Sequence, residues 1–87
     1  MKRKEPRIYV IVECVKPEND YIEHHYIVQA CSIPDAERRV YDYIKKSGNK
    51  VSHKDLSVYD TTKEIDLVID MYENSYEDTW TVIKQGE

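Results

Sequence analysis

Hydrophobic and polar positions alternate along much of the chain with the two-residue period of β-strands. Residues 7–16 (RIYVIVECVK) are apolar on both alternating faces, which is typical of a strand covered on both sides, so we place it centrally in a sheet. Residues 21–31 (YIEHHYIVQAC) alternate more strictly between apolar and polar positions. Because Pro17-Glu18-Asn19-Asp20 has turn chemistry, we predict that the two segments form an antiparallel hairpin.

The segment between Ser32 and Gly48 instead has the period of an amphipathic helix. Ser32 is a favourable N-cap, and the Asp35 carboxylate can reach back to the unpaired N–H groups at the helix start. Gly48 can adopt the left-handed conformation that ends many helices. We expect this helix to lie across one face of the sheet through its apolar stripe, which consists of Ile33, Ala36, Val40, Tyr43 and Ile44.

Residues 65–72 (IDLVIDMY) fit both the period of a strand and that of a helix. We favour a strand, because only that register places two aspartates, Asp66 and Asp70, on one side and four large apolar residues on the other. Those apolar residues are Ile65, Leu67, Ile69 and Met71.

Two more strands complete the predicted fold. One lies within residues 51–59, with residues 56–59 as its better half, and one covers residues 79–85 (TWTVIKQ). The prediction for residues 1–87 is a single small α+β domain, with an antiparallel sheet of four to five strands and one α-helix packed on one face. The element order is β-β-α-β-β-β, and residues 1–6 form a flexible basic tail.

Composition agrees with a sheet-rich domain and adds an asymmetry of charge. The 87 residues include nine Val, nine Ile and eight Tyr, residue types that favour strands. The net charge of −4 divides into +3 for residues 1–54 and −7 for residues 55–87. No segment approaches the roughly 20 apolar residues of a membrane span, and no signal peptide is apparent. We therefore expect no membrane partner and a cytoplasmic location.

The sequence offers little catalytic chemistry. His24 and His25 are neighbours on a predicted strand, so their side chains point to opposite faces and cannot act on one substrate. There is no glycine-rich phosphate loop, and the Cys and His residues lack the close-pair spacing of a zinc site. We therefore expect a non-enzymatic protein without a cofactor or a metal site.

The acidic last third contains the sharpest candidate site. On a strand, its acids would form a negative ridge with alternate residues about 6.6 Å apart, suited to an Arg- and Lys-rich groove on a larger protein. Tyrosine and tryptophan among these acids are typical of a protein-binding surface. The alternative is that the charges only prevent edge-to-edge aggregation of an outer strand. The candidate partner-binding residues are Asp66, Asp70, Tyr72, Glu73, Tyr76, Glu77, Asp78 and Trp80.

Basic residues on the predicted helix and at the N-terminus define a second candidate site. They could contact the phosphates of a nucleic acid, whose neutralisation dominates such binding. Against this stand the overall acidity and the absence of the aromatic signature of RNA-binding sheets. The residues are Lys2, Arg3, Arg38, Arg39, Lys45 and Lys46.

Residues 26–40 (YIVQACSIPDAERRV) resemble a strand-to-helix junction found in small α+β proteins, including proteins of phages and mobile elements. The resemblance implies a phage or mobile-element origin and no particular activity. The expected cytoplasmic location is then the cytoplasm of the host, if a phage encodes the chain. Our leading hypothesis is an inhibitor of a host nucleic-acid enzyme or defence complex, which would act by occupying a basic surface of its partner. The alternatives are a small nucleic-acid-binding domain, and a structural or assembly component that forms a homodimer or larger homo-oligomer through a free strand edge.

Overall fold

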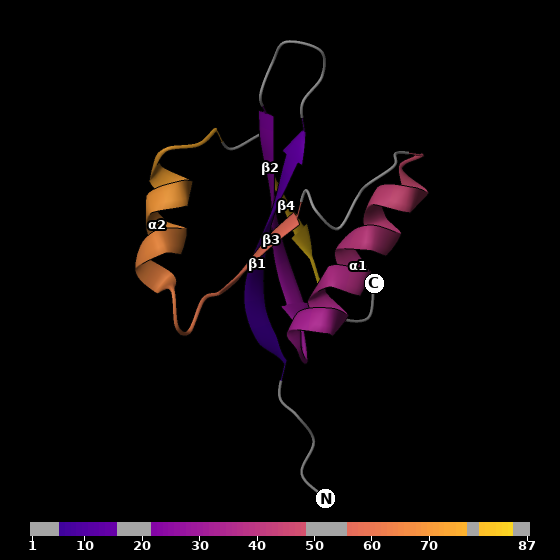
Figure 1. Cartoon of the computed structure of the whole chain (residues 1–87), viewed down its shortest axis with the longest axis horizontal. Helices are drawn as coiled ribbons and strands as arrows, with labels where there is room; N and C mark the ends of the chain where they lie inside the picture. The colour runs from indigo at the N-terminus through magenta and orange to yellow at the C-terminus, as the bar shows by residue number, and fades with distance from the viewer. Residues whose placement is uncertain (1–5, 16–21, 49–55, 77–78, 85–87) are drawn as a thin grey trace, which may run out of the picture.

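The computed structural model describes residues 6–15, 22–48, 56–76 and 79–84. Figure 1 shows three layers, with the sheet between a helix on each side. The predicted α+β class and the four strands are confirmed. In chain order the elements are β1 (Arg7–Val15), β2 (Ile22–Ala30), α1 (Ile33–Lys46), β3 (Leu56–Asp60), α2 (Ile65–Glu73) and β4 (Trp80–Ile83).

The four strands are arranged in the order β3-β1-β2-β4. β1 pairs antiparallel with β2 from Arg7↔Ala30 to Val15↔Ile22, which confirms the predicted hairpin. β1 also pairs antiparallel with β3, so it lies inside the sheet as its two-sided apolar pattern predicted. The turn predicted at residues 17–20, the first part of the strand predicted within residues 51–59 and the basic tail at residues 1–5 fall outside the described residues.

Helix α1 forms the main hydrophobic core with one face of the sheet. The Ser32 hydroxyl accepts from the N–H of Asp35 at 3.3 Å, and the Asp35 carboxylate accepts from the N–H of Cys31 at 3.1 Å. Gly48 follows the helix with a φ of 81°, as its position predicted. Each fully buried Val or Ile in this core contributes about 1.5–3 kcal/mol. The core residues are Tyr9, Ile11, Tyr26, Val28, Ala30, Ala36, Val40, Ile44 and Ile83.

The strand predicted over residues 65–72 is wrong: this segment is helix α2, the second α-helix of the described residues. The helix grows from a turn after β3, where the N–H groups of Lys63 and Glu64 donate to the carbonyl of Asp60. The N–H of Val68 then donates to the carbonyl of Glu64, which continues the helical pattern. Residues 65–72 fit the period of a strand and that of a helix, and these local backbone hydrogen bonds select the helix.

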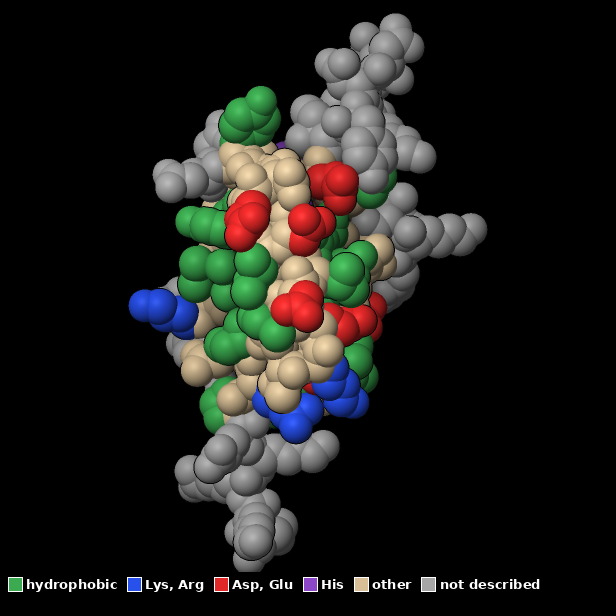
Figure 2. Space-filling model, turned by 90° about the vertical axis from the view of Figure 1, so that its left-hand side faces the viewer, with side chains coloured by type: hydrophobic (Ala, Val, Ile, Leu, Met, Phe, Trp, Pro, Cys, Tyr) green, Lys and Arg blue, Asp and Glu red, His purple; other side chains and the backbone are tan. Residues whose placement is uncertain are grey.

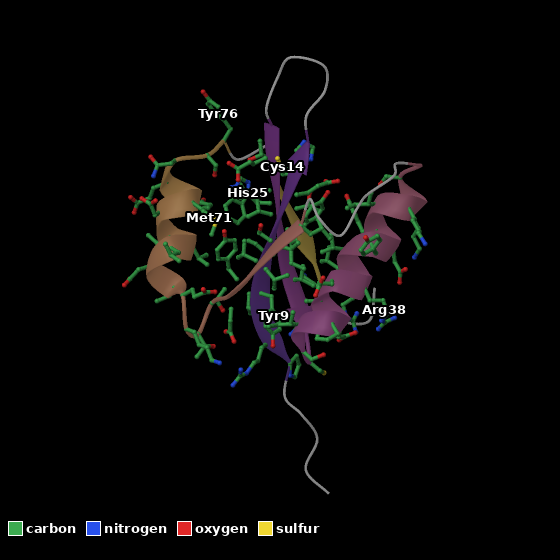
Figure 3. All side chains as sticks on the ribbon, in the orientation of Figure 1. Tyr9, Cys14, His25, Arg38, Met71 and Tyr76 are labelled. Atoms are coloured by element: carbon green, nitrogen blue, oxygen red, sulfur yellow. The ribbon has the colours of Figure 1, made fainter. Side chains whose placement is uncertain are left out.

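The second face of the sheet explains why a helix is needed here. Val10 and Val12 are buried on the face opposite α1, and α2 lies over that face (Figure 1). Met71 extends from α2 toward the sheet (Figure 3). A sheet whose central strand is apolar on both faces needs a layer on each side, and α2 supplies the second one.

The purely antiparallel sheet is also wrong, because β4 pairs parallel with β2. Helix α2 crosses the sheet between β3 and β4, and a crossover of this kind returns the chain in the direction in which it left. β3 and β4 therefore run in the same direction at the two edges of a mixed sheet.

Neither of the two helices has the length and apolar character that crossing a bilayer requires, as far as the described part of the chain goes.

Candidate functional site

The exposed surface of α2 carries an acidic stripe, which we define as Asp66, Asp70 and Glu73. These residues are spaced i, i+4 and i+7, so they share one side of the helix, and all three are exposed. Figure 2 shows several acidic side chains on the face that α2 presents. The ridge predicted from strand spacing is therefore wrong in its geometry, but the helix still brings these carboxylates together.

An apolar border, which we define as Ile65, Leu67, Ile69 and Tyr72, flanks the acidic stripe. Their exposed fractions are 47%, 53%, 47% and 55%, and no residue of α2 is fully buried. Figure 2 shows hydrophobic side chains beside the acidic ones. Ile65, Ile69 and Tyr72 lie on one side of the stripe and Leu67 on the other, and half-exposed large apolar residues of this kind are typical of an interaction surface.

No ion pair between described residues neutralises the acidic stripe. Helix α2 (IDLVIDMYE) contains no Lys or Arg. Within the described residues, the ion pairs join Arg7 to Asp60 and both Arg38 and Arg39 to Asp35, so none reaches the stripe. Glu73 lies in the last turn of the helix, where the macrodipole disfavours negative charge. Asp66 in the first turn is favourably placed, whereas Glu73 lowers helix stability, so folding alone does not account for Glu73.

Trp80 links α2 to the sheet. Its ring stacks on that of His25 with centroids 4.3 Å apart, and it meets Tyr72 edge-on at 5.6 Å. Its indole N–H donates to the Ser75 hydroxyl at 2.6 Å. Of the predicted site residues, Trp80 thus makes internal contacts, whereas Tyr72 is half exposed and Tyr76 is 81% exposed.

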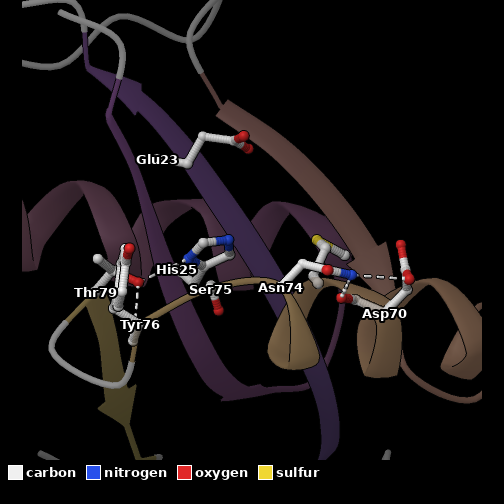
Figure 4. A pocket seen from close by; sticks show the side chains of 8 residues that line it. Glu23, His25, Asp70, Asn74, Ser75, Tyr76 and Thr79 are labelled. Carbon is white, nitrogen blue, oxygen red and sulfur yellow. Dashed lines mark hydrogen bonds between the residues drawn. The ribbon is translucent and has the colours of Figure 1, made fainter.

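A pocket of about 470 Å³ opens between the C-terminal end of α2 and the sheet (Figure 4). It adjoins the acidic stripe because Asp70 belongs to both. Asp70 and Tyr76 were predicted site residues, whereas no local sequence pattern connects Glu23 and His25 of β2 with α2. The pocket is lined by Glu23, His25, Asp70, Met71, Asn74, Ser75, Tyr76 and Thr79.

His25 is the buried titratable group of this pocket. Desolvation by burial lowers the pKa of its imidazole, while the negative charge of Glu23 acts in the opposite direction. Its Nδ1 lies 3.4 Å from the Thr79 hydroxyl oxygen. That hydroxyl donates its only hydrogen to the carbonyl of Tyr76 at 2.7 Å, so toward His25 it can only accept. A neutral imidazole with its proton on Nδ1 would donate along this contact.

The alternative basic site is only partly assembled. Arg38, Arg39 and Lys46 line a groove of about 230 Å³ between α1 and β4, together with Asp42 and Tyr43. However, Arg38 and Arg39 both bind the Asp35 carboxylate, at 2.6 and 3.3 Å. Their partial neutralisation leaves less charge for a phosphate. Lys45 and Lys46 are exposed in the last turn of α1, and Lys2 and Arg3 lie outside the described residues.

Two candidate residues of the acidic site, Glu77 and Asp78, also lie outside the described part of the chain. Among the residues that the structure does describe, no three His, Cys, Asp or Glu side chains are grouped so that they could hold a metal ion. Comparison of the chain with protein-family models, with curated proteins and with solved structures found no match. The function must therefore be argued from the residues of the site itself.

Proposed function

We propose that this protein is a non-enzymatic protein-binding module that uses the outer face of α2 to occupy a basic surface on a larger partner. One observation carries the proposal: the acidic stripe has no neutralising cation among the described residues and lies beside the half-exposed apolar border. Charge and apolar area together on one helix face match the chemistry of helix-mediated recognition.

The two parts of this face have different roles in binding. The apolar border supplies affinity, since burying the exposed half of each Ile or Leu contributes roughly 1 kcal/mol. The acidic stripe supplies orientation and a faster encounter with a positively charged partner. Trp80 holds α2 in place from beneath through Tyr72 and Ser75, so it supports the surface rather than forming part of it.

The partner that suits this face has an Arg- and Lys-rich groove with an apolar floor. A nucleic-acid enzyme has such a groove, because it must neutralise phosphates and stack bases. A protein that places carboxylates in that groove inhibits the enzyme by excluding its substrate. In its most specific form, the proposed protein-binding module is an inhibitor of a host nucleic-acid enzyme or defence complex.

The test is a comparative capture from host lysate, with the wild-type protein and two charge-reversed variants as baits. Asp66→Lys/Asp70→Lys alters the acidic stripe, and Asp42→Lys/Glu37→Lys makes the same change on α1, on the other side of the sheet. We expect the wild type and the α1 variant to retain a protein that the α2 variant loses. Affinity for that protein should fall with salt concentration. Equal capture by the two variants would refute the proposal.

Two further measurements address the alternatives. A gel shift with DNA and RNA at low salt that is abolished by Arg38→Ala/Lys46→Ala would replace the proposal with nucleic-acid binding. Light scattering that finds a stable dimer, disrupted by substitutions in the short edge strand β4, would replace it with homo-oligomeric assembly.

A further inference from the structure

An apolar strip stays exposed beside α2, on the face of the sheet that this helix covers. On that face Val10 and Val12 are buried, at 1% and 6% exposed. Ile8 alternates onto the same face at the start of β1, yet it is 40% exposed. Val82 of β4 is 57% exposed, and it pairs with the partly exposed Ile27 of β2. We define the sheet strip as Ile8, Ile27 and Val82.

The sheet strip and one side of α2 form a continuous surface. Trp80 meets Tyr72 edge-on at 5.6 Å, and Val82 lies two residues further along β4, so it points to the same face as Trp80. Tyr72 shares one side of α2 with Ile65 and Ile69, at the spacing i, i+4 and i+7. That side, which we call the α2 flank, therefore points toward β4. Figure 2 shows hydrophobic side chains gathered to the left of the acidic ones.

This face of the sheet has room for one more helix. Neighbouring strands are about 4.8 Å apart, so four strands span about 14 Å between the axes of the outer pair. A helix with its side chains is about 10–12 Å across, so α2 covers only part of this width. A second helix laid beside α2 would satisfy its backbone groups internally, whereas an extended segment would need a free strand edge rather than a face.

The charges around the surface select its occupant. Helix α2 contributes the acidic stripe, and α2, β2 and β4 contain no Lys or Arg, although the exposed Lys84 directly follows β4. A second copy that used its own α2 would bring another acidic stripe to within the roughly 8–10 Å that separates packed helices, so the two stripes would repel. A helix with Lys and Arg beside its apolar side would instead be attracted.

We propose that the sheet strip and the α2 flank together receive one amphipathic α-helix of the partner, which lies alongside α2 with its apolar side on the strip. Its Lys and Arg residues would lie next to Asp66 and Glu73 of the acidic stripe, because these two acids border the α2 flank. The inference rests on the proposed function, since it names the element of the partner that the α2 face recognises.

The surface can be tested with a synthetic helix and the whole protein. The probe is a peptide of about 14 residues with leucine at i, i+4, i+7 and i+11, lysine at the flanking positions and alanine elsewhere. A peptide of the same composition in scrambled order is the control. Trp80 is the only tryptophan and contacts Tyr72, so its fluorescence reports binding. We expect a dissociation constant on the order of 100 μM at low salt, weaker binding at high salt, and a gain of helix by the bound peptide in circular dichroism.

Matched substitutions locate the binding site. Ile69→Ser in the α2 flank and Leu67→Ser on the other side of α2 change side chains that are 47% and 53% exposed. We expect Ile69→Ser to weaken binding roughly threefold to tenfold and Leu67→Ser to leave it unchanged. Val82→Thr keeps a β-branched residue in β4 and should weaken binding roughly threefold. Circular dichroism of the variants checks that each retains the fold.

Four results would overturn the inference: no saturation by the probe, equal binding of the scrambled peptide, equal effects of Leu67→Ser and Ile69→Ser, and a dimer in light scattering that Val82→Thr dissociates. The last result would make a second copy the occupant. In the lysate capture, a partner lost by Asp66→Lys/Asp70→Lys but kept by Ile69→Ser/Val82→Thr would reject this docking mode and retain the proposed function. Probe binding that depends on Ile69 and Val82, with equal capture by the two charge-reversed variants, would retain the docking surface and reject the proposed function.

Discussion

The two helices lie on opposite faces of one sheet, yet they are built in different ways. Helix α1 has 14 residues, a hydroxyl N-cap, lysines in its last turn and three buried apolar residues. Helix α2 has nine residues, no side-chain cap bond, no basic residue in its last turn and no buried residue. Helix α1 is optimised for folding, whereas α2 covers its face of the sheet with half-buried Val68 and Met71 and presents the rest of its side chains to solvent.

The largest expected difference between the helices is in the free energy of unfolding that an Ile→Ala substitution removes. Ile44→Ala in α1 removes a side chain that is 3% exposed and leaves a cavity in the main core, so we expect it to lower the free energy of unfolding by about 2–5 kcal/mol. Ile69→Ala in α2 removes a side chain that is 47% exposed and should cost less than about 1 kcal/mol. Urea denaturation followed by circular dichroism measures both values. Equal costs would mean that the two helices contribute alike to the core.

The next prediction concerns how α2 is held. Trp80→Ala removes the stacking on His25, the edge contact with Tyr72 and the hydrogen bond to Ser75. Because Trp80 is half buried, we expect a loss of about 2 kcal/mol, below the value for a fully buried aromatic residue. Amide hydrogen exchange should show loss of protection in α2 while α1 stays protected. Uniform loss of protection in both helices would contradict an independent attachment of α2.

Acid should affect the α2 side of the sheet before it affects the start of α1. Burial lowers the pKa of His25, so the unfolded state takes up its proton first, at about 6.5, and stability falls from there down to the folded pKa. For one proton, the free energy of unfolding changes by at most about 1.4 kcal/mol per pH unit. The charges of Glu23 and His24 act on the same group in opposite directions.

Asp35 at the start of α1 responds at lower pH. The Cys31 N–H and then Arg38 lower the pKa of its carboxyl, so its contribution is present above about 3.9 and is lost as pH falls through the folded pKa. NMR titration of His25 and of Asp35 measures the two windows. Loss of α1 and α2 signals at the same pH would show that the helices are not separately sensitive to acid.

The contrast between the helices also explains why α1 could be predicted from local sequence patterns and α2 could not. The caps of α1 and the hairpin depend on neighbouring residues and were confirmed. Of the predicted stripe, Ala36, Val40 and Ile44 are buried, whereas Ile33 and Tyr43 are exposed. The helix over residues 65–73 was missed because its local pattern is ambiguous. A non-local signal was present: a central strand that is apolar on both faces needs two covering layers, and the predicted fold contained only one. Applied to residues 65–72, this requirement would have favoured the helix.

The candidate site divides in the same way. The acidic stripe and Tyr76 could be found from composition, because the negative charge is concentrated in the last third of the chain. The pocket could not be found from the sequence, because Glu23 and His25 are about 50 residues distant from Asp70 and Tyr76. The parallel pairing of β4 with β2 brings the two groups together. No local pattern indicates that pairing.

The smallest expected effect is the most direct measure of what the acidic stripe costs. Glu73→Gln removes a negative charge from the C-terminal end of α2, so we expect it to raise the free energy of unfolding by about 0.3–1 kcal/mol at low salt. The matched change in α1, Lys46→Gln, removes a favourable charge from the last turn and should lower stability by a similar amount. Opposite signs in denaturation experiments, both diminished by salt, would show that α1 carries charges that stabilise its fold and α2 carries charges that do not. A neutral or destabilising Glu73→Gln would remove the argument that the stripe is retained at the expense of stability, and with it the strongest reason to assign the stripe to a partner.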